Sequence, residues 1–317
     1  MKPRDLPYSI MKENTKRLMQ FCAASALLAP ALILSGLRAK KASREANVFR
    51  VLSLHHVPDA GSFERLVVHL MSKHGIISPD KAETMIVGAG HTPTRGKIPY
   101  LLTFDDGFRS HAGLVKEILG RYGIKAVFFI CPGIVDTAVE LQRSVVARSV
   151  FDPPLHESEV TEGMLPMRWA EVEELHKEGH AIGSHSLGHM RASGLDEETL
   201  SYELKESASV IEKRIGVVAK WYAFPWGDIA SIDEASLRLA GQHYCFCCST
   251  VPSVNVPDTA RLILFRMGVD LRSPFVYQQM VLAGGLDFLA RNEVRTLLKL
   301  ARKARTEDRT MPRAQFR

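Results

Sequence analysis

Two short clusters of carboxylates and histidines have the residue types and spacing of a metal-dependent catalytic site. The first is Thr103-Phe-Asp-Asp-Gly107, in which Asp105 and Asp106 are adjacent. Neighbouring carboxylates repel each other and raise one pKa, a cost that a bound cation removes. Gly107 permits a tight turn that would aim both side chains into one site. Asp-Asp-Gly is also a common turn sequence, so this cluster alone has moderate specificity.

The second cluster is the pair His185 and His189, which lie four residues apart. This spacing places two imidazoles on one side of a helical turn and suits a single metal ion. With one carboxylate, the pair forms a set of three ligands that leaves positions open for water and substrate, as a catalytic metal requires. A surface turn is the alternative for the two histidines taken alone.

A third cluster is aromatic and rich in proline, and it contains Tyr222, Phe224, Pro225 and Trp226. An aromatic face beside polar ligands is a common way to hold a sugar ring or an acetyl methyl group. We therefore expect these four residues to bind substrate. A core strand followed by a turn is the alternative.

Strands and helices are predicted to alternate around these clusters. About seven strand–helix repeats predict an α/β fold, with a parallel sheet closed or nearly closed into a distorted (β/α)7-type barrel. In such barrels the chemistry collects at the C-terminal ends of the strands. His55, Asp105, Asp106, His185, Trp226 and Arg266 all fall where a predicted strand ends. The predicted strands are residues 49–54, 98–104, 126–131, 180–184, 220–224, 243–250 and 261–267.

The motifs, in this order, resemble the polysaccharide deacetylase superfamily, the nodulation-type chitooligosaccharide deacetylases of carbohydrate esterase family four. Thr103-Phe-Asp-Asp-Gly107 and His185-Ser-x-x-His189 resemble its first two motifs. Leu54-His-His-Val57 resembles the "Tyr-His-x-Val" opening of one bacterial branch, and Tyr222-Ala-Phe-Pro-Trp-Gly227 resembles its "Phe-Ala-Tyr-Pro-Tyr-Gly" motif. Met167-Arg-Trp-Ala-Glu171 resembles the helix before its histidine motif. The resemblance extends over residues 49–270.

The resemblance implies that Asp106, His185 and His189 bind one divalent metal. Asp105 would be the general base that takes a proton from a water activated by the metal. Zn²⁺ suits this ligand set, and Co²⁺, Ni²⁺, Fe²⁺ or Mn²⁺ also fit it.

Two positions depart from the best-known members of the family. Those members place an arginine two residues before the proline of the third motif, where this chain has Ala223, and they carry a general-acid histidine on a late strand. We hypothesise that Arg266 orients Asp105 through a charge-assisted hydrogen bond. His55, at the end of the first predicted strand, is the candidate general acid, as the resemblance to the branch with the early "Tyr-His" motif implies. His56 is the weaker candidate, because its side chain should point away from that of its neighbour in an extended strand. The other histidines, which include His69, His74, His91 and His243, are interpreted as ordinary surface or core residues without partners.

The expected function is therefore metal-dependent hydrolysis of acetyl groups from the N-acetylated sugars of a polysaccharide or glycoconjugate. One alternative is the same fold acting on a non-sugar amide, because a fold alone does not specify a function. Another is a non-catalytic protein that binds glycan. The presence of all four residues, Asp105, Asp106, His185 and His189, favours catalysis over that alternative.

Charge is concentrated at the two ends of the chain. Residues 1–50 hold ten Lys and Arg against three acidic residues, and residues 299–317 hold seven against two. With a net charge of +6 for the whole chain, residues 51–298 carry −6, which argues against a nucleic-acid-binding domain. We expect an N-terminal segment at 1–47, a catalytic domain at 48–298 and a basic tail at 299–317.

The N-terminal segment contains an uncharged run, residues 18–37, which is long enough to cross a bilayer. We expect an uncleaved anchor or an interfacial helix, so the protein would be membrane-associated through this segment, or otherwise cytoplasmic. A helix docked on the body of the protein is the alternative. The five cysteines are odd in number, and three of them fall within residues 245–248, where they are interpreted as small core residues of a strand rather than as a metal half-site.

Overall fold

Seven short parallel strands alternate with helices, as the sequence predicts. The computed structural model describes residues 47–88, 97–257, 259 and 261–307. All neighbouring strands pair in parallel, in the order β6-β5-β4-β3-β2-β1-β7. The strands are β1 (Arg50–Leu54), β2 (Tyr100–Phe104), β3 (Val127–Ile130), β4 (Ala181–Ser184), β5 (Trp221–Ala223), β6 (Phe246–Cys248) and β7 (Arg266–Gly268).

The sheet nearly closes on itself between β6 and β7. β7 pairs with β1, whereas Leu264, two residues before β7, forms a parallel bridge with Cys248 of β6. The Leu264 amide donates to the Cys247 carbonyl at 2.7 Å, and the Ser249 amide donates to the Leu264 carbonyl at 2.8 Å. The predicted strand at 261–267 is therefore divided: its first half contacts β6, and only its end pairs with β1. This arrangement confirms the predicted (β/α)7-type barrel.

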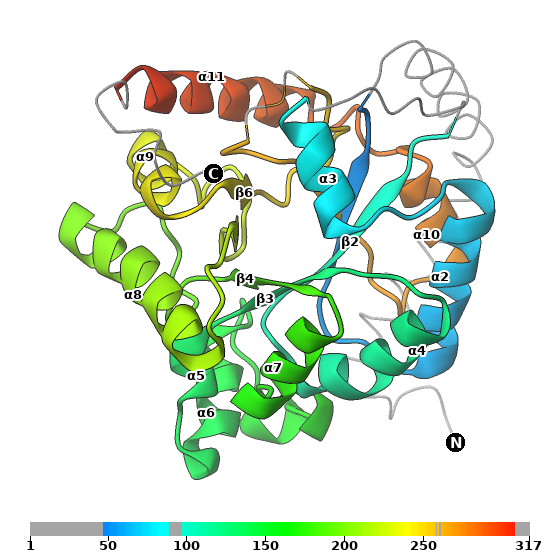
Figure 1. Ribbon diagram of the computed structural model, residues 1–317, viewed down its shortest axis with the longest axis horizontal. Helices are drawn as coiled ribbons and strands as arrows, with labels where there is room; N and C mark the ends of the chain where they lie inside the picture. The colour runs from blue at the N-terminus through cyan, green and yellow to red at the C-terminus, as the bar shows by residue number, and fades with distance from the viewer. Residues whose placement is uncertain (1–46, 89–96, 258, 260, 308–317) are drawn as a thin grey trace, which may run out of the picture.

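Helices surround the barrel (Figure 1). Several begin where an aspartate or serine side chain accepts a hydrogen bond from a first-turn amide, as Asp59, Ser78, Asp196 and Asp233 do. The helices are α2 (Ala60–Lys73), α3 (Pro79–Ile86), α4 (Lys116–Arg121), α5 (Pro132–Val135), α6 (Val139–Ser149), α7 (Trp169–Lys177), α8 (Glu197–Ile215), α9 (Glu234–His243), α10 (Phe275–Leu282) and α11 (Arg291–Glu307). A π-helical turn, η1 (His111–Val115), precedes α4, and two short 3₁₀ turns cover Glu157–Glu159 and Glu162–Met164.

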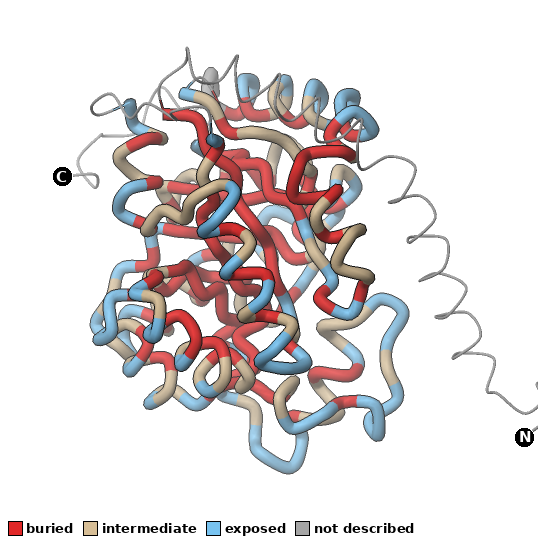
Figure 2. Tube along the Cα trace, turned by 90° about the vertical axis from the view of Figure 1, so that its right-hand side faces the viewer, coloured by how far each residue is buried: buried red, intermediate tan, exposed pale blue. Residues whose placement is uncertain are grey.

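Alternate strand residues form two separate cores, because successive side chains of a strand point to opposite faces. One set, which includes Leu52, Leu102 and Phe128, packs under the helices. The other set fills the inside of the barrel and includes Val51, Leu101, Phe129 and Trp221. Figure 2 shows these buried segments at the centre of the molecule, with exposed residues around them.

The inner layer becomes polar toward the C-terminal ends of the strands. Ser53 follows Val51 on the inner face of β1, and Thr103 and Asp105 follow Leu101 on the inner face of β2. At the opposite end, α3 supplies Ala82 and Met85 to the inner core, and the Ile77 amide just before it donates to the carbonyl of Tyr100, where β2 begins. The sequence analysis does not predict α3. This helix closes the N-terminal end of the barrel and leaves the other end for the chemistry.

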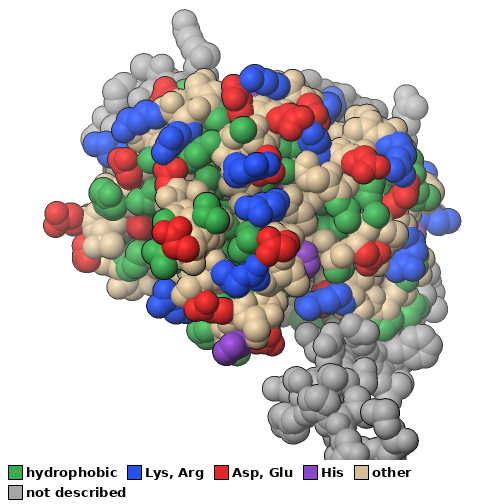
Figure 3. All heavy atoms as spheres, turned by 90° about the horizontal axis from the view of Figure 1, so that it is seen from below, with side chains coloured by type: hydrophobic (Ala, Val, Ile, Leu, Met, Phe, Trp, Pro, Cys, Tyr) green, Lys and Arg blue, Asp and Glu red, His purple; other side chains and the backbone are tan. Residues whose placement is uncertain are grey.

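The outer surface carries charges of both signs. Figure 3 shows Lys and Arg next to Asp and Glu over one whole face of the molecule, interspersed with apolar groups.

The predicted boundary between the catalytic domain and the basic tail lies in the region of α11. α11 runs from Arg291 to Glu307, and its Ala301 and Ala304 are buried. The predicted boundary at residue 298 therefore falls inside α11, and the first part of the predicted tail, up to Ala304, is helical. The predicted apolar run at 18–37 lies outside the described residues. Among the helices that are described, none has the length and hydropathy to cross a membrane.

A buried ion pair joins β1 to the segment after α10. The Arg50 guanidinium donates to both oxygens of Asp287, at 3.2 and 2.7 Å, and both side chains are almost fully buried. We expect Asp287→Ala to lower the free energy of unfolding by about 3–5 kcal/mol, because it leaves the Arg50 charge buried and uncompensated. Urea denaturation followed by circular dichroism measures this loss.

The control is Glu173→Ala, which removes an exposed pair with Lys177. Such a pair contributes about 0.3–0.5 kcal/mol. Equal losses in the two variants would contradict the structural role assigned to the buried pair.

Candidate active site

The Asp105–Gly107 segment turns sharply where β2 ends. The Asp105 amide still donates to the Leu54 carbonyl at 2.8 Å, but Asp106 and Gly107 have left-handed backbones, with φ of 69° and 63°. A Cβ at Gly107 would lie 3.0 Å from the Ile130 side chain, so this turn accepts no larger residue without a shift. Because of this turn, the adjacent side chains of Asp105 and Asp106 have different neighbours in the site.

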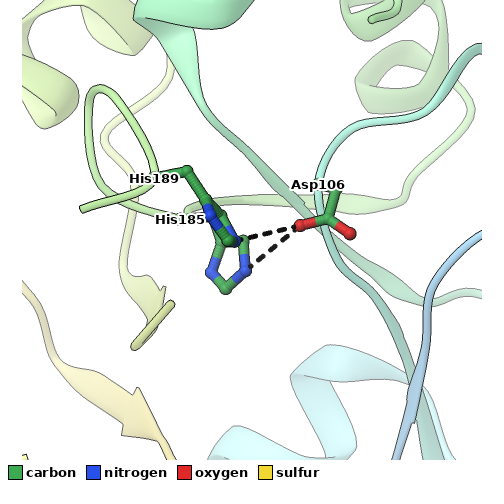
Figure 4. A group of neighbouring side chains, drawn as sticks. All are labelled: Asp106, His185 and His189. Carbon is green, nitrogen blue, oxygen red and sulfur yellow. Dashed lines mark ion pairs between the residues drawn. The ribbon is translucent and has the colours of Figure 1, made fainter. Parts of the chain in front are cut away.

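Asp106 faces the two predicted histidine ligands (Figure 4). Its Oδ1 atom lies 3.5 Å from His185 Nε2 and 3.3 Å from His189 Nε2, and all three side chains are buried. This Oδ1 atom accepts no hydrogen bond, although it is inaccessible to water. The three candidate ligand atoms lie within 4.8 Å of one another, which is close enough to hold one metal ion.

The hydrogen bonds of the histidines direct their free nitrogens at Asp106. Nδ1 of His185 lies 2.7 Å from the Ala223 carbonyl, and Nδ1 of His189 lies 2.7 Å from the Ser149 carbonyl. A carbonyl only accepts, so each Nδ1 carries a proton, and in the neutral form of each ring the lone pair is on Nε2. Burial lowers the pKa of His185 to about 4, so this ring is neutral at pH 7. Two lone pairs facing an orphaned carboxylate oxygen fit a divalent cation.

The histidines are not on a helical turn, and this part of the sequence prediction is wrong. Residues 185–190 form a loop between β4 and α8 in which Ser186 and His189 have left-handed backbones. The two rings nevertheless meet at a centroid distance of 5.0 Å. The bent backbone of the loop therefore brings the two rings together, as a helical turn was predicted to do.

Left-handed backbones are concentrated at this site. Among the described residues other than glycine, five have φ between 60° and 69°, and four of these are Asp106, Ser186, His189 and Trp226. Each such conformation costs on the order of 1–3 kcal/mol, and it persists only where the surrounding contacts over-determine it. Strain of this kind collected around one cluster of ligands is typical of a functional site.

Asp105 is held by Arg266 and Ser53. The Arg266 Nη1 donates to Asp105 Oδ1 at 2.7 Å, and the Ser53 hydroxyl donates to Oδ2 at 3.0 Å. Burial opposes the charge of Asp105, but the attraction of Arg266 outweighs it and holds the pKa of this carboxyl below its usual value. Asp105 is thus a carboxylate at neutral pH. Arg266 thus contacts the carboxylate that the sequence analysis expects it to orient.

His55 lies at the rim of the site, above Asp105. Its Nε2 is 3.7 Å from Asp105 Oδ2, and its side chain is 55% exposed. His56 points elsewhere, with Nδ1 3.5 Å from the Ser110 hydroxyl and its ring edge against Phe108. The two neighbours thus diverge as expected for extended backbone.

One residue that the sequence analysis left out of the site holds His55 in place. His111, which is fully buried in η1, donates from Nε2 to the His55 carbonyl at 3.0 Å. The prediction that the other histidines have no partners is therefore wrong for His111, and also for His180, whose Nδ1 accepts from the Ala126 amide. The position of His111 on a π-helical turn, a feature frequent at functional sites, has no short sequence signature.

The aromatic cluster divides between core and site. Tyr222 and Phe224 have no exposed surface and pack in the outer core, where Tyr222 stacks on Tyr244. Their side chains do not reach the site, so their placement does not support the predicted contact with substrate. Pro225 is buried as well. Trp226 is partly exposed and lies 4.2 Å from the His189 ring, next to the candidate ligands.

The cysteines do not form a second metal cluster among the described residues. Cys247 and Cys248 are buried and Cys245 is partly buried, and all three are free thiols. The group of Asp106, His185 and His189 is the one set of His, Cys, Asp and Glu found near enough to hold a metal in the described part of the chain.

The comparison with known proteins agrees with this site. Residues 92–244, which contain Asp105, Asp106 and both histidine ligands, match the family model for polysaccharide deacetylase. These residues are thus identified as a polysaccharide deacetylase domain. The match ends before β6 and β7, so it does not include Arg266.

Solved structures of deacetylases share the fold. Streptococcus pyogenes deacetylase PplD, in complex with acetate, is 17% identical with a TM-score of 0.57, over 74% of this chain and 97% of that one. IcaB from Ammonifex degensii is 18% identical with a TM-score of 0.58, over 77% and 98%. The BpsB deacetylase domain from Bordetella bronchiseptica is 22% identical with a TM-score of 0.56, over 70% and 96%. At these identities the likeness concerns the fold.

A curated relative is similar over a short stretch. The uncharacterized protein YlxY of Bacillus subtilis (strain 168) is 40% identical over 67 residues, which are 20% of this chain and 21% of that protein. The alignment thus spans about a fifth of this relative.

The geometry of the three candidate ligands predicts one tight site for a divalent ion. After chelation, the protein should bind one equivalent of Zn²⁺. His185→Ala should lower the affinity by at least about 100-fold, because it removes a ligand itself, and loss of a residue that merely hydrogen-bonds to a ligand already lowers metal affinity by about 10–100-fold. Competition with a chromophoric chelator measures the affinity.

His243→Ala, at the end of α9, is the matched control and should leave the affinity unchanged. Equal affinities in the wild type and in His185→Ala would place the metal elsewhere.

Proposed function

We propose that this chain is a metal-dependent deacetylase that removes acetyl groups from the N-acetylated sugars of a polysaccharide or glycoconjugate. The observation that carries the proposal is the difference in surroundings between two adjacent carboxylates. Asp106 faces the Nε2 atoms of two imidazoles, while Asp105 is ionised, held by Arg266 and open toward His55. The match of residues 92–244 to the polysaccharide deacetylase family model supports the same chemistry.

Asp106, His185 and His189 would hold the ion. A divalent cation at this position would polarise the acetyl carbonyl and make a water more acidic, with Zn²⁺ the ion that suits two imidazoles and one carboxylate. The Nδ1 hydrogen bonds to the Ala223 and Ser149 carbonyls keep both rings in the orientation that ligation needs.

Asp105 acts as the general base. Arg266 occupies its Oδ1 and keeps the group deprotonated, so the proton of the attacking water goes to Oδ2, which faces Ser53 and His55. The Arg266 guanidinium is itself fixed from a second side, since its Nε donates to the Ser249 carbonyl at 2.9 Å. Arg266 therefore orients the base in the role that the third-motif arginine has in better-known members of the family.

His55 acts as the general acid for the leaving amine. The amine must take up a proton as the C–N bond breaks, because an unprotonated amide anion is a poor leaving group. His55 is exposed at the rim, next to Asp105 and within reach of a substrate that enters from solvent. His111 fixes the backbone of His55 through its carbonyl, so the ring keeps this position beyond the end of β1.

Trp226 provides the apolar contact for the substrate. Its partly exposed ring lies against His189 on one side, and the Arg191 guanidinium lies 5.3 Å from the ring centroid. An aromatic face next to the ligands can pack against a sugar ring or the acetyl methyl group. Substrate binding is proposed here for Trp226 alone among the four aromatic-cluster residues.

The reaction is tested by acetate release from N-acetylglucosamine oligomers. Activity should vanish on chelation and return with Zn²⁺ or Co²⁺. Asp105→Asn should retain the metal but lower kcat by about 10²–10⁴-fold, the range expected for loss of a general base. A chain that binds metal stoichiometrically yet releases no acetate would favour a non-sugar amide as substrate or a glycan-binding role.

The role of His55 is tested by changing the leaving group. His55→Ala should lower kcat by about 10²–10⁴-fold on the sugar amide, which needs a proton donor. On an activated aryl acetate the loss should be much smaller, because a phenolate leaves without protonation. His56→Ala is the matched control and should behave like the wild type with both substrates. Equal losses on amide and aryl ester in His55→Ala would rule out the general-acid role.

A further inference from the structure

The loop that carries both histidine ligands leaves regular backbone pairing after His185, whose amide still donates to the Ile130 carbonyl at 2.8 Å. Residues 185–190 lie between β4 and α8, and the backbones of Ser186 and His189 are left-handed. Buried amides in such a segment need other partners, because an unpaired buried amide costs as much as a lost hydrogen bond. The conformation of this loop determines where the Nε2 atoms of His185 and His189 point.

A single buried carboxylate supplies the partners for the middle of the loop. Glu203 Oε2 accepts from the Leu187 amide at 3.1 Å and from the Gly188 amide at 3.0 Å. Glu203 is buried on α8, sixteen and fifteen residues away from these amides in sequence. The two consecutive amides converge on one oxygen because the backbone bends between them, an arrangement that binds anionic groups.

The loop is also held from the opposite side. The Gly133 amide at the start of α5 donates to the Leu187 carbonyl at 2.9 Å, and a Cβ at Gly133 would lie 2.8 Å from that oxygen. α8 also holds the preceding strand, since Ser207 and Ser184 share a hydrogen bond of 2.7 Å between their hydroxyls. Leu187 is therefore fixed between α5 and α8, with a histidine ligand two residues away on each side.

We propose that Glu203 is a positioning residue for the metal centre. Its carboxylate holds the Leu187 and Gly188 amides, and so sets the loop conformation in which His185 and His189 direct Nε2 at Asp106. The role is to accept hydrogen bonds at the correct reach, and the negative charge is secondary. The inference rests on the metal site of the proposed function but not on deacetylation, so metal affinity tests it independently of activity.

Three substitutions separate reach from charge. Glu203→Gln keeps the length and an acceptor oxygen but loses the charge, Glu203→Asp keeps the charge but is shorter by one methylene, and Glu203→Leu keeps neither. Zn²⁺ affinity should stay near the wild-type value in Glu203→Gln and fall by about 10–100-fold in Glu203→Asp and Glu203→Leu, as for other outer-shell partners of metal ligands. The visible absorption spectrum of the Co²⁺-loaded protein should change in the last two variants, since it reports ligand geometry.

Glu212→Leu is the matched control, because this glutamate lies on the exposed face of the same helix. It should leave affinity and spectrum unchanged. If Glu203→Leu does not fold, the contrast between Glu203→Gln and Glu203→Asp still decides the question. Unchanged affinity in all folded variants overturns the proposal, and so does an equal loss in Glu203→Gln and Glu203→Asp. A wild-type chain that binds metal without releasing acetate would refute the proposed function alone.

Discussion

A buried carboxylate oxygen without a hydrogen-bond donor is the constraint on which the site depends. Oδ1 of Asp106 is inaccessible to water and faces two imidazole nitrogens whose lone pairs point toward it. Three electron-rich atoms at this separation destabilise one another, and burial of an unpaired carboxylate is itself costly. A divalent cation would turn this repulsion into ligation. Asp106 and His189 hold these positions with left-handed backbones.

The barrel provides the two surroundings that the adjacent aspartates need. Its inner face is apolar along most of its length and becomes polar at the C-terminal strand ends. There Asp105 accepts hydrogen bonds from Ser53 and from Arg266 of β7. Because β7 lies next to β1 in the sheet, a residue late in the chain reaches the carboxylate at the end of β2. Arg266 keeps Asp105 ionised without a metal, whereas the turn at Gly107 sends Asp106 to the histidines. Two chemically identical side chains thereby acquire different roles.

Much of this arrangement could be predicted from the sequence, because strand periodicity and motif spacing are local signals. The strand pattern predicts that Asp105 lies at a strand end. The absence of an arginine at Ala223 favours Arg266 as its replacement. Local signals failed where tertiary contacts decide. The His185–His189 spacing fits a helical turn, yet the Glu203 carboxylate and Gly133 amide hold a loop there instead. Likewise, the pattern of aromatic residues at 222–226 does not reveal that Tyr222 and Phe224 face the core.

The most direct test of the account is anomalous diffraction from crystals of the protein grown with Zn²⁺, recorded on both sides of the zinc absorption edge. The account predicts one strong anomalous peak within bonding distance of Asp106 Oδ1, His185 Nε2 and His189 Nε2, with Asp105 still bound to Arg266. A peak at the thiols of Cys245, Cys247 and Cys248, or no peak between Asp106 and the two histidines, would contradict it.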